Sequence, residues 1–432
     1  MNYSGALAYL DRHINLEATA GKVDGLSLEK MRQLVRVVGD PQTSYPVIHI
    51  TGTNGKGSVA RMASALLQEH GLSVGTYTSP HLERINERLA WNLEPIGDAD
   101  FANQIELLAN VESLLDTPPS YFELLTAAAF SWFAEIAVDV AVVEVGMLGR
   151  YDATNVADGL VAVITNIGRD HTDGQGDWRV EIASEKAGII KPDATLVVGE
   201  SDPSLLPIYE AEGPAELVVS ERDFFTSDDL AAFGGRLFSV RTPRDVYSEL
   251  YLPLHGAHQT ENAATALVAT EAFFGRALDH ETVSSALGAV TMPGRFEVVH
   301  RNPLVILDGA HNVDGARRAA ETLADEFDVP GRLVLVVGLL RGRDPREMLE
   351  AFRAERADLV IACAPDSPRA IPAEDVAVAA RSLPVMTEVV ADVREAVGRA
   401  LAVAAEEDAV LVAGSLYVAG AARPVLTPHE SA

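Results

Sequence analysis

The sequence has only one cysteine, Cys363, and no apolar run long enough to cross a membrane. A single cysteine excludes an internal disulfide, which fits the reducing cytoplasm, where we expect the protein to act. A spanning helix needs about 20 apolar residues, and no stretch approaches that length. The opening residues also lack a basic start followed by an apolar run. We therefore expect neither a membrane segment nor a signal peptide.

Positive charge is also scarce in this chain. Asp and Glu number 63 against 34 Lys and Arg, which gives a formal net charge of −29. Such a surface repels nucleic acid and anionic membranes, so we expect neither as a partner. It also repels small anionic substrates, unless the binding site gathers cations and a metal. Without such a site, the acidity would serve only solubility.

The length and the apolar pattern predict two domains. A chain of 432 residues exceeds what one hydrophobic core usually organises. From residue 46, short apolar runs alternate with helical periods, which predicts a mainly parallel sheet flanked by helices. Residues 214–255, with "ELVVS", "RLFSVRT" and "SELYLPL", predict a small antiparallel strand group. The alternation restarts after "TMPGRFEVVHRN" (291–302), where Pro and Gly separate two regular segments.

We therefore expect an α/β fold with two unequal parts. The first is a P-loop ATPase-type domain over residues 1–292, which includes the antiparallel group. A linker follows over residues 293–300, and a smaller Rossmann-like α/β domain covers residues 301–432.

The stretch "PVIHITGTNGKGSVARMASALLQEHG" (46–71) joins a strand pattern to an amphipathic helix through a glycine-rich turn. Backbone N–H groups in such a turn and at a helix start bind phosphates, and Lys56 adds a mobile positive charge. The alternative is a turn that only begins a helix. We predict phosphate contacts from Gly52, Thr53, Asn54, Gly55, Lys56, Gly57 and Ser58.

This loop departs from the standard G-x-x-x-x-G-K-[ST] pattern. In that pattern the hydroxyl directly after the lysine binds Mg²⁺. Here Gly57 follows Lys56, and the hydroxyl comes one place late, at Ser58. Ser79 in "TSPHL" is another hydroxyl after a predicted strand, although a Ser-Pro pair by itself is an ordinary turn.

More polar residues follow other predicted strands of the first domain. Glu144 interrupts an apolar run at a carboxyl end, where open α/β sheets bind ligands, and a buried carboxylate there needs a metal or cation. A structural ion pair is the alternative. His171 follows another strand end, although a lone histidine is usually structural. Lys186 lies in an apolar setting, where burial makes a lysine reactive unless it pairs with Glu185 or Asp170.

The second domain contributes polar residues of its own. Asp308 and His311 stand where one of its predicted strands ends, in "LDGAHN". Lys56, Glu144 and His171 come at strand ends of the first sheet and face this domain. Such a layout is typical of a cleft enzyme that uses ATP and Mg²⁺.

Seven motifs occur in a fixed order over roughly residues 20–420: "GTNGKGSV", "TSPHL", "EVGMLGRYDATN", "EKAGI", "HQTENAA", "PGRFEVV" and "LDGAHN". Together they resemble the folylpolyglutamate synthases and bacterial dihydrofolate synthases, which belong to the Mur-ligase-like amide ligases. The resemblance implies a monomer that adds L-glutamate to dihydropteroate and to the glutamate tail of reduced folates, through an acyl phosphate. It also implies ATP as co-substrate and Mg²⁺, expected as two ions.

Carried onto this sequence, the resemblance implies four sets of site residues. The catalytic set is Lys56, Glu144, His171 and Lys186, the last matching a lysine that family members carbamylate. The metal set is Ser79, Glu144 and His171. ATP contacts beyond the loop are Asn262, Arg295, Asp308 and His311. The folate set is Val23, Asp24, Gly25, Phe122, Glu123, Leu124, Leu125, Tyr151, Asp152 and Ala153.

The sequence departs from the family pattern E-V-G-L-G-G-R-L-D-A-T-N beside the implied folate pocket. Leu148 replaces a glycine and Tyr151 replaces a leucine. After His171, "TDGQGDW" stands in place of the usual aromatic or Leu-Gly run. We expect these changes to alter the shape of the pocket.

Two other functions stay open from the sequence. One is a Mur-type ligase acting on another carboxylate, which the residues of the motifs "TSPHL" and "EKAGI" disfavour. The other is a P-loop NTPase switch without ligase activity, which would hydrolyse ATP without a second substrate. The polar residues at strand ends and the second domain argue against the switch.

Overall fold

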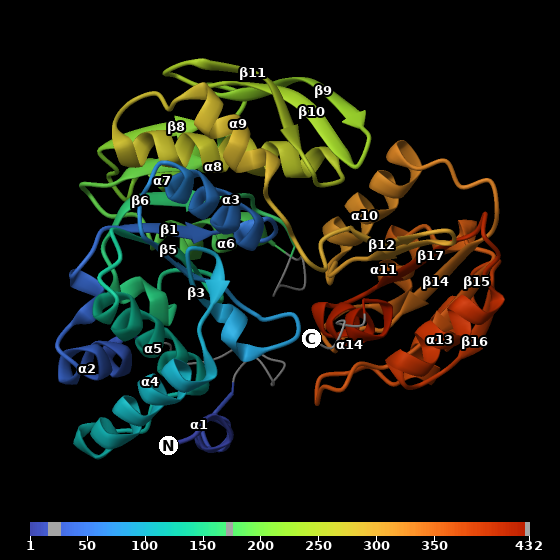
Figure 1. The fold of residues 1–432 in the computed structure, drawn as a ribbon, viewed down its shortest axis with the longest axis horizontal. Coiled ribbons are helices and arrows are strands. Elements are labelled where there is room, and N and C mark those ends of the chain that lie inside the picture. Colours follow the sequence, from blue (N-terminus) through green and yellow to red (C-terminus); the bar gives the residue numbers. More distant parts are fainter. Residues whose placement is uncertain (16–26, 170–175, 428–432) are drawn as a thin grey trace.

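The computed structural model describes residues 1–15, 27–169 and 176–427. The predicted site residues Val23, Asp24, Gly25 and His171 lie outside these ranges. Figure 1 shows two sheet-centred bodies side by side, connected by the chain that leads from α9 into β12. None of the helices described has both the length and the apolar character needed to cross a membrane.

The larger body is built on an eight-stranded sheet. Its order is β4 (Glu94–Pro95), β3 (Leu89–Trp91), β2 (Val74–Tyr77), β5 (Val140–Glu144), β1 (Val47–Thr51), β6 (Gly159–Ile164), β7 (Thr195–Val198) and β8 (Glu216–Val219). The neighbouring strands β2, β5, β1, β6, β7 and β8 are all parallel, and β3 and β4 add an antiparallel edge next to β2. The central strands are fully buried because helices cover both faces, as in other parallel sheets.

Helices form a layer on each face of this sheet. One face carries α3 (Lys56–Glu69), α8 (Ala257–Phe274) and α9 (His280–Gly288). The predicted apolar stripe of α3 is confirmed, since Val59, Met62, Ala63, Leu66 and Leu67 are fully buried. The other face carries α1 (Tyr3–Leu10), α2 (Glu29–Val37), α4 (Asp98–Val111), α5 (Tyr121–Glu135), α6 (Trp178–Ala187) and α7 (Leu206–Glu210). Short 3₁₀ turns in this body are η2 (Pro41–Thr43), η3 (Ile85–Arg88), η4 (Glu112–Leu114), η5 (Ala153–Val156) and η6 (Pro203–Leu205), and the smaller body has η7 (Ala354–Arg356).

A separate antiparallel sheet covers α8 and α9 at the top of Figure 1. Its order is β11 (Val246–Leu252), β10 (Gly235–Arg241) and β9 (Phe225–Ala232). The antiparallel group is therefore confirmed, but its first predicted strand is wrong. "ELVVS" forms β8, which pairs in parallel with β7 in the large sheet. The third strand is β9, whose polar, mostly exposed sequence "FTSDDLAA" gave no strand signal.

The smaller body is a six-stranded sheet between two helical layers. Its order is β12 (Glu297–Arg301), β13 (Leu304–Leu307), β17 (Ala409–Ala413), β14 (Leu333–Val337), β15 (Leu359–Ala362) and β16 (Met386–Val389). One face carries α10 (Val313–Glu326), α11 (Pro345–Ala351) and α12 (Ala373–Ala380), and the other carries α13 (Val393–Val403) and α14 (Leu416–Leu426). Only β12 is antiparallel, and it begins inside the segment that we expected as a linker.

Glu326, at the end of α10, connects the two bodies through an ion pair and hydrogen bonds. Its buried carboxylate pairs with Arg236 of β10, and it accepts a hydrogen bond from the Gly256 N–H at 2.8 Å. His255 Nδ1 lies 2.8 Å from the other carboxylate oxygen. Burial alone would raise the pKa of Glu326, but the hydrogen bonds from His255, Gly256 and Arg236 lower it overall.

Replacing Glu326 with alanine should destabilise the protein by about 3 kcal/mol, because it leaves buried donors without their acceptor. This cost is at the low end of the range for a broken buried ion pair, because Arg236 still pairs with Asp229. Arg236 Nε lies 2.6 Å from Asp229 Oδ1. Because the pKa of Glu326 is lowered in the fold, this stabilisation is lost as the pH falls below the ordinary glutamate value of about 4.3.

Chemical denaturation of Glu326→Ala at neutral and acid pH measures this effect. The matched control is Glu350→Ala, which removes an exposed pair with Arg346 at 2.8 Å and should leave stability nearly unchanged, because solvent and salt screen exposed pairs. Equal losses in the two variants would contradict the role given to Glu326.

Candidate active site

The glycine-rich loop lies between β1 and α3, as the sequence predicted. Gly55 precedes α3 with a φ of 82°, and no side chain caps the helix start, so its first N–H groups are available to an anion. Gly52 has a φ of 152°, and a Cβ there would lie 1.8 Å from Thr165 Oγ1. No other residue fits at Gly52, because the loop crosses so close to β6.

Residues after β6 hold this loop in place. The Thr165 hydroxyl donates to the Asn54 carbonyl at 2.6 Å, and the Asn54 N–H donates to Asn166 Oδ1 at 2.9 Å. Lys56 Nζ folds back over the loop and donates to the carbonyls of Gly52 at 3.1 Å and Thr53 at 3.3 Å. The ammonium therefore stands over the same backbone that would receive phosphates.

Two buried side chains from other helices also contact the loop. Asn262 of α8 lies against Gly55, where a Cβ would come within 2.4 Å of Asn262 Oδ1. Lys186 of α6 donates from Nζ to the Gly52 carbonyl at 2.7 Å. Lys56 and Lys186 thus meet at one carbonyl oxygen, although 130 residues separate them in the sequence.

Glu144 ends β5 and lies directly against the start of α3. Its buried carboxylate accepts the Ser79 N–H at 3.1 Å, and a Cβ on Gly57 would lie 3.4 Å from its Oε2. Burial raises the pKa of Glu144, while the charge of Lys56, the Ser79 N–H and the charge of Arg295 act to lower it. The glycine that follows the loop lysine thus lies directly beside a buried carboxylate.

The residues present suit a hard divalent cation. Carboxylate and hydroxyl oxygens, as Glu144 and Ser79 supply, are the ligands that Mg²⁺ prefers. A buried carboxylate with only one backbone donor and nearby cations also leaves acceptor capacity for an ion. Within residues 1–15, 27–169 and 176–427, no three His, Cys, Asp or Glu side chains group as a metal site. The third predicted ligand, His171, lies outside those residues.

Asp308 and His311 follow β13 of the smaller body, and Arg295 lies in the turn that leads into β12. Asp308 accepts the N–H groups of Phe296 at 2.9 Å and Ala310 at 2.8 Å. Burial raises the pKa of Asp308, and these N–H groups and the charge of Arg295 oppose the rise. His311 Nδ1 lies 3.1 Å from the Gly309 carbonyl. Arg295 therefore acts electrostatically on Glu144 and on Asp308, one carboxylate from each body.

Asn312 is a site residue that the sequence reasoning missed. Its Nδ2 donates to Asn54 Oδ1 at 2.8 Å, while its own Oδ1 caps α10 by accepting the Gly315 N–H at 2.8 Å. This amide contact joins the phosphate loop directly to the smaller body. Arg88 and Asn166 were also missed: Arg88 is buried and acts on Glu144, and Asn166 holds the loop. The available signal was sequence position, since Asn312 ends the motif "LDGAHN", Arg88 comes shortly after "TSPHL", and Asn166 comes shortly before His171.

Most of the residues that we predicted to bind folate, among those that the structure describes, have structural roles. Glu123 forms a capping box with Ser120 at the start of α5, and Leu124 and Leu125 are fully buried, with no surface for a ligand. Asp152 accepts the N–H groups of Met147 at 2.8 Å and Thr154 at 3.0 Å. Burial raises the pKa of Asp152, and hydrogen bonds led by the Thr154 hydroxyl oppose it. Ala153 is buried in the same cluster as the two leucines.

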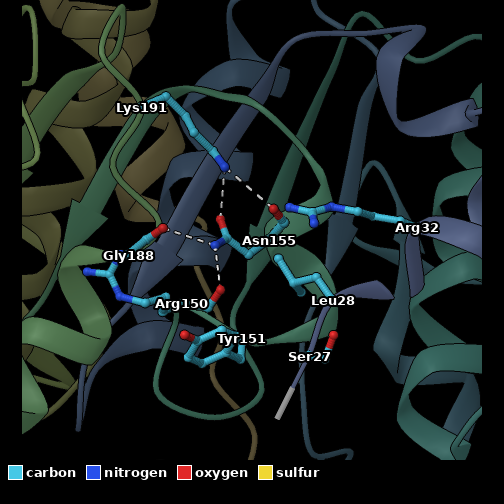
Figure 2. Close-up of a pocket in the computed structure, with 8 residues that line it drawn as sticks. All are labelled: Ser27, Leu28, Arg32, Arg150, Tyr151, Asn155, Gly188 and Lys191. Carbon is cyan, nitrogen blue, oxygen red and sulfur yellow. Dashed lines mark hydrogen bonds between the residues drawn. The ribbon is translucent and has the colours of Figure 1, made fainter. Parts of the chain in front are cut away.

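Phe122 and Tyr151 are the two aromatic residues of the predicted folate set, and Phe122 is partly buried while Tyr151 is exposed. Phe122 lies against the loop after β5, where a Cβ on Gly146 would come within 2.4 Å of its ring. Tyr151 is 44% exposed and lines a cavity of about 370 Å³, which Figure 2 shows. Leu148, which replaces a family glycine, has a φ of 59° and so keeps the left-handed backbone that glycine favours.

Comparison with known proteins agrees with this geometry. Residues 50–270 match the family described as Mur ligase middle domain, and residues 294–416 match Mur ligase, glutamate ligase domain. The dihydrofolate synthase/folylpolyglutamate synthase of Mycobacterium tuberculosis is 39% identical, over 92% of this chain and 89% of the relative. The enzyme of the same name from Escherichia coli is 32% identical, over 96% of this chain and 95% of the relative.

Solved structures agree as well. Folylpolyglutamate synthase from M. tuberculosis, in complex with ADP, superposes with a TM-score of 0.91 at 37% identity, covering 99% of both chains. A bifunctional folylpolyglutamate synthase/dihydrofolate synthase with Mn, AMPPNP and L-glutamate bound has a TM-score of 0.85 at 30% identity, covering 99% of this chain and 98% of the other. The resemblance read from the seven motifs is confirmed, and the chain belongs to the dihydrofolate synthase/folylpolyglutamate synthase family of Mur ligases.

Proposed function

We propose that this protein is an ATP-dependent ligase that joins L-glutamate through an amide bond to dihydropteroate and to the glutamate tail of reduced folates. One structural observation carries the proposal. Lys56, Lys186 and Glu144 converge on the glycine-rich loop, and Asn312 ties that loop to the second body. Relatives of the same family bind ADP, AMPPNP, Mn and L-glutamate, which supports ATP, a divalent metal and glutamate as ligands.

The chemistry requires two anions to approach each other. A carboxylate oxygen of the acceptor attacks the γ-phosphoryl group of ATP and forms an acyl phosphate and ADP. The glutamate amine then attacks the acyl carbon, and phosphate leaves. Catalysis by this chain is therefore mainly charge neutralisation and positioning, supplied by the loop N–H groups, Lys56 and Arg295. Asp308 and His311 orient ATP and the smaller body, whose contact with Asn54 shields the acyl phosphate from water.

The proposed metal is Mg²⁺, as two ions, held by Ser79, Glu144 and His171. A bound ion would supply positive charge to the phosphates of ATP. Glu144 supports this assignment because it is buried beside Gly57, where the standard loop would carry its metal-binding hydroxyl.

Lys186 is proposed to carry a carbamate. Its neutral amine would attack carbon dioxide, forming an N–C bond and releasing a proton to solvent. Together with the earlier loss of a proton from the ammonium form, this step converts a buried cation into an anion, while the carbamate nitrogen keeps one N–H for the Gly52 carbonyl. The buried position next to Lys56 favours the change, because it replaces two adjacent cations with an opposite pair.

Further parts of the proposal concern the whole protein. We propose two domains that meet within residues 293–300, both folate activities in one enzyme, a monomer, and action in the cytoplasm. The folate acceptor would bind near Phe122 and Tyr151, together with Val23–Gly25. Tyr151 is exposed and Phe122 is partly buried against the loop after β5, and this arrangement supports that position.

Release of phosphate from ATP should require both an acceptor and L-glutamate. We expect turnover with dihydropteroate and with tetrahydrofolate, each only in the presence of glutamate. Lys56→Ala should reduce the rate by roughly 100- to 1000-fold, because a phosphate-neutralising charge is lost. Lys30→Ala, an exposed lysine on α2, is the control and should keep its activity. Hydrolysis that ignores the acceptor would instead support an NTPase switch.

Glu144→Gln should weaken metal binding and, at the same time, increase the stability of the metal-free protein. Because burial raises the pKa of Glu144, its carboxylate destabilises the metal-free fold progressively as the pH rises above about 4.3. The variant should therefore melt higher than wild type without metal at neutral pH. It should also need on the order of 10- to 100-fold more Mg²⁺ for activity.

Melting curves with and without Mg²⁺, and an Mg²⁺ titration of activity, measure the two effects. Glu271→Gln is the control, since burial raises the pKa of Glu271 too, but that residue pairs with Tyr247 away from the loop. A Glu144→Gln enzyme with the Mg²⁺ requirement of wild type would refute the ligand role.

A carbamate on Lys186 should be visible by ¹³C NMR. After equilibration with ¹³C-bicarbonate, wild type should show a carbamate signal that Lys186→Ala lacks and Lys30→Ala retains. Activity should fall at least roughly 100-fold in Lys186→Ala, as expected for a group that positions the phosphates. An active wild-type enzyme whose Lys186 amine is unmodified by mass or electron density would remove the carbamate.

A further inference from the structure

The cavity beside Tyr151 concentrates positive charge in a strongly acidic protein. Arg32 comes from α2, Arg150 from the loop after β5, and Lys191 from the segment after α6, and all three line the cavity of about 370 Å³. Figure 2 shows Arg32 and Lys191 extending towards Asn155 from opposite sides. The chain as a whole has 63 acidic and 34 basic residues, so three cations around one cavity need an explanation.

The carboxylates nearby neutralise these cations only in part. Arg150 pairs with Glu212, and Lys191 has a loose pair with Asp158 at 3.7 Å, whose side chain is 91% exposed. No ion pair forms with Arg32 in the part of the chain that the structure describes. Burial lowers the pKa of Lys191, Asp158 opposes the shift, and the charge of Arg32 adds to it, so the two cations Lys191 and Arg32 repel each other. The cavity therefore has positive charge to offer an anion.

The walls of the cavity are held by hydrogen bonds. Asn155 Nδ2 donates to the carbonyls of Arg150 and Gly188, both at 2.9 Å, and Lys191 Nζ donates to Asn155 Oδ1 at 3.1 Å. A Cβ on Gly188 would lie 2.4 Å from Arg150 Cβ, so the two backbone segments are in direct contact. Such an arrangement is preorganised, which reduces the entropy cost of binding a ligand.

The cavity shares its walls with the candidate active site. The Arg150 N–H donates to the Glu185 carbonyl at 2.8 Å, next to Lys186, whose Nζ reaches the loop at Gly52. Tyr151, predicted to contact folate, forms part of the same lining. A ligand in this cavity therefore lies close to both the expected acceptor position and the helix that carries Lys186.

We propose that this cavity is a carboxylate-binding subsite that takes the α-carboxylates of a γ-linked glutamyl chain. The inference rests on the proposed function, which makes such a chain part of a substrate. Guanidinium groups bind carboxylates through two parallel hydrogen bonds, and a γ-glutamyl chain carries one free α-carboxylate on each residue. The half-exposed Tyr151 ring offers apolar surface to the methylene groups. The volume fits a small ligand, since such pockets start at about 300 Å³.

Free di- or tricarboxylates have the same chemistry, so the experiment includes both sources. Calorimetry on the full chain, without ATP, measures binding of tri-γ-glutamate and of citrate. Arg32→Gln should weaken binding at least roughly tenfold, because a direct charged contact is lost. Arg32 is exposed on α2, so the substitution should leave the fold intact. The control is Arg381→Gln, an exposed arginine of the smaller body that pairs with Glu374.

Kinetics then identify the source of the carboxylate. If the site holds the glutamyl tail, Arg32→Gln should raise KM for triglutamylated tetrahydrofolate about tenfold and leave KM for dihydropteroate, which has no tail, unchanged. Citrate binding that Arg32→Gln weakens, with no change in either KM, would support the subsite and assign it to a free carboxylate.

Binding of neither ligand to wild type, or equal binding by Arg32→Gln and Arg381→Gln, would overturn the subsite. Because calorimetry needs no turnover, its outcome is separate from that of the ligase assay. Loss of ligase activity with retained binding would count against the proposed function, not against the carboxylate site.

Discussion

The contact between the Glu144 carboxylate and the amino end of α3 constrains the whole site. A buried carboxylate is costly unless cations or a metal compensate it, and Lys56, Arg295 and Arg88 all act on this one. The contact lies at the unusual position of the loop. Gly57 packs directly beside Glu144, since a Cβ built on it would be in van der Waals contact with the carboxylate, 3.4 Å from Oε2. We propose that Glu144 of β5 and Ser79 of "TSPHL" take the place of the usual hydroxyl.

A second constraint is that the site is shared between two bodies. Arg295 acts on carboxylates of both, Asn312 binds the phosphate loop through Asn54, and Glu326 fixes α10 to the antiparallel sheet. A ligase that protects an acyl phosphate from water benefits from such contacts, because the second body can cover the reacting atoms. The smaller body therefore contributes directly to the chemistry that we propose.

Much of this could be read from the sequence, and the failures have physical reasons. Buried parallel strands and the stripe on α3 were predictable, because burial on both faces leaves continuous apolar runs. The strand β9 was not, since an exposed antiparallel strand has little apolar pattern, and "ELVVS" alone cannot show which sheet it joins. Asn312 and Asn166 act through contacts between distant segments, which no local pattern shows. Leu124 and Leu125 adjoin the site in sequence, but their side chains face the core.

The central claim is that Glu144 and Ser79 take over the metal-binding task of the missing hydroxyl. A crystal structure of the protein with AMPPNP and Mn²⁺, read by anomalous scattering, tests this most directly. The account predicts a metal peak bonded to Ser79 Oγ and a Glu144 oxygen, beside the phosphates at the start of α3. A metal bonded instead to Ser58, with Glu144 still held only by the Ser79 N–H, would contradict it.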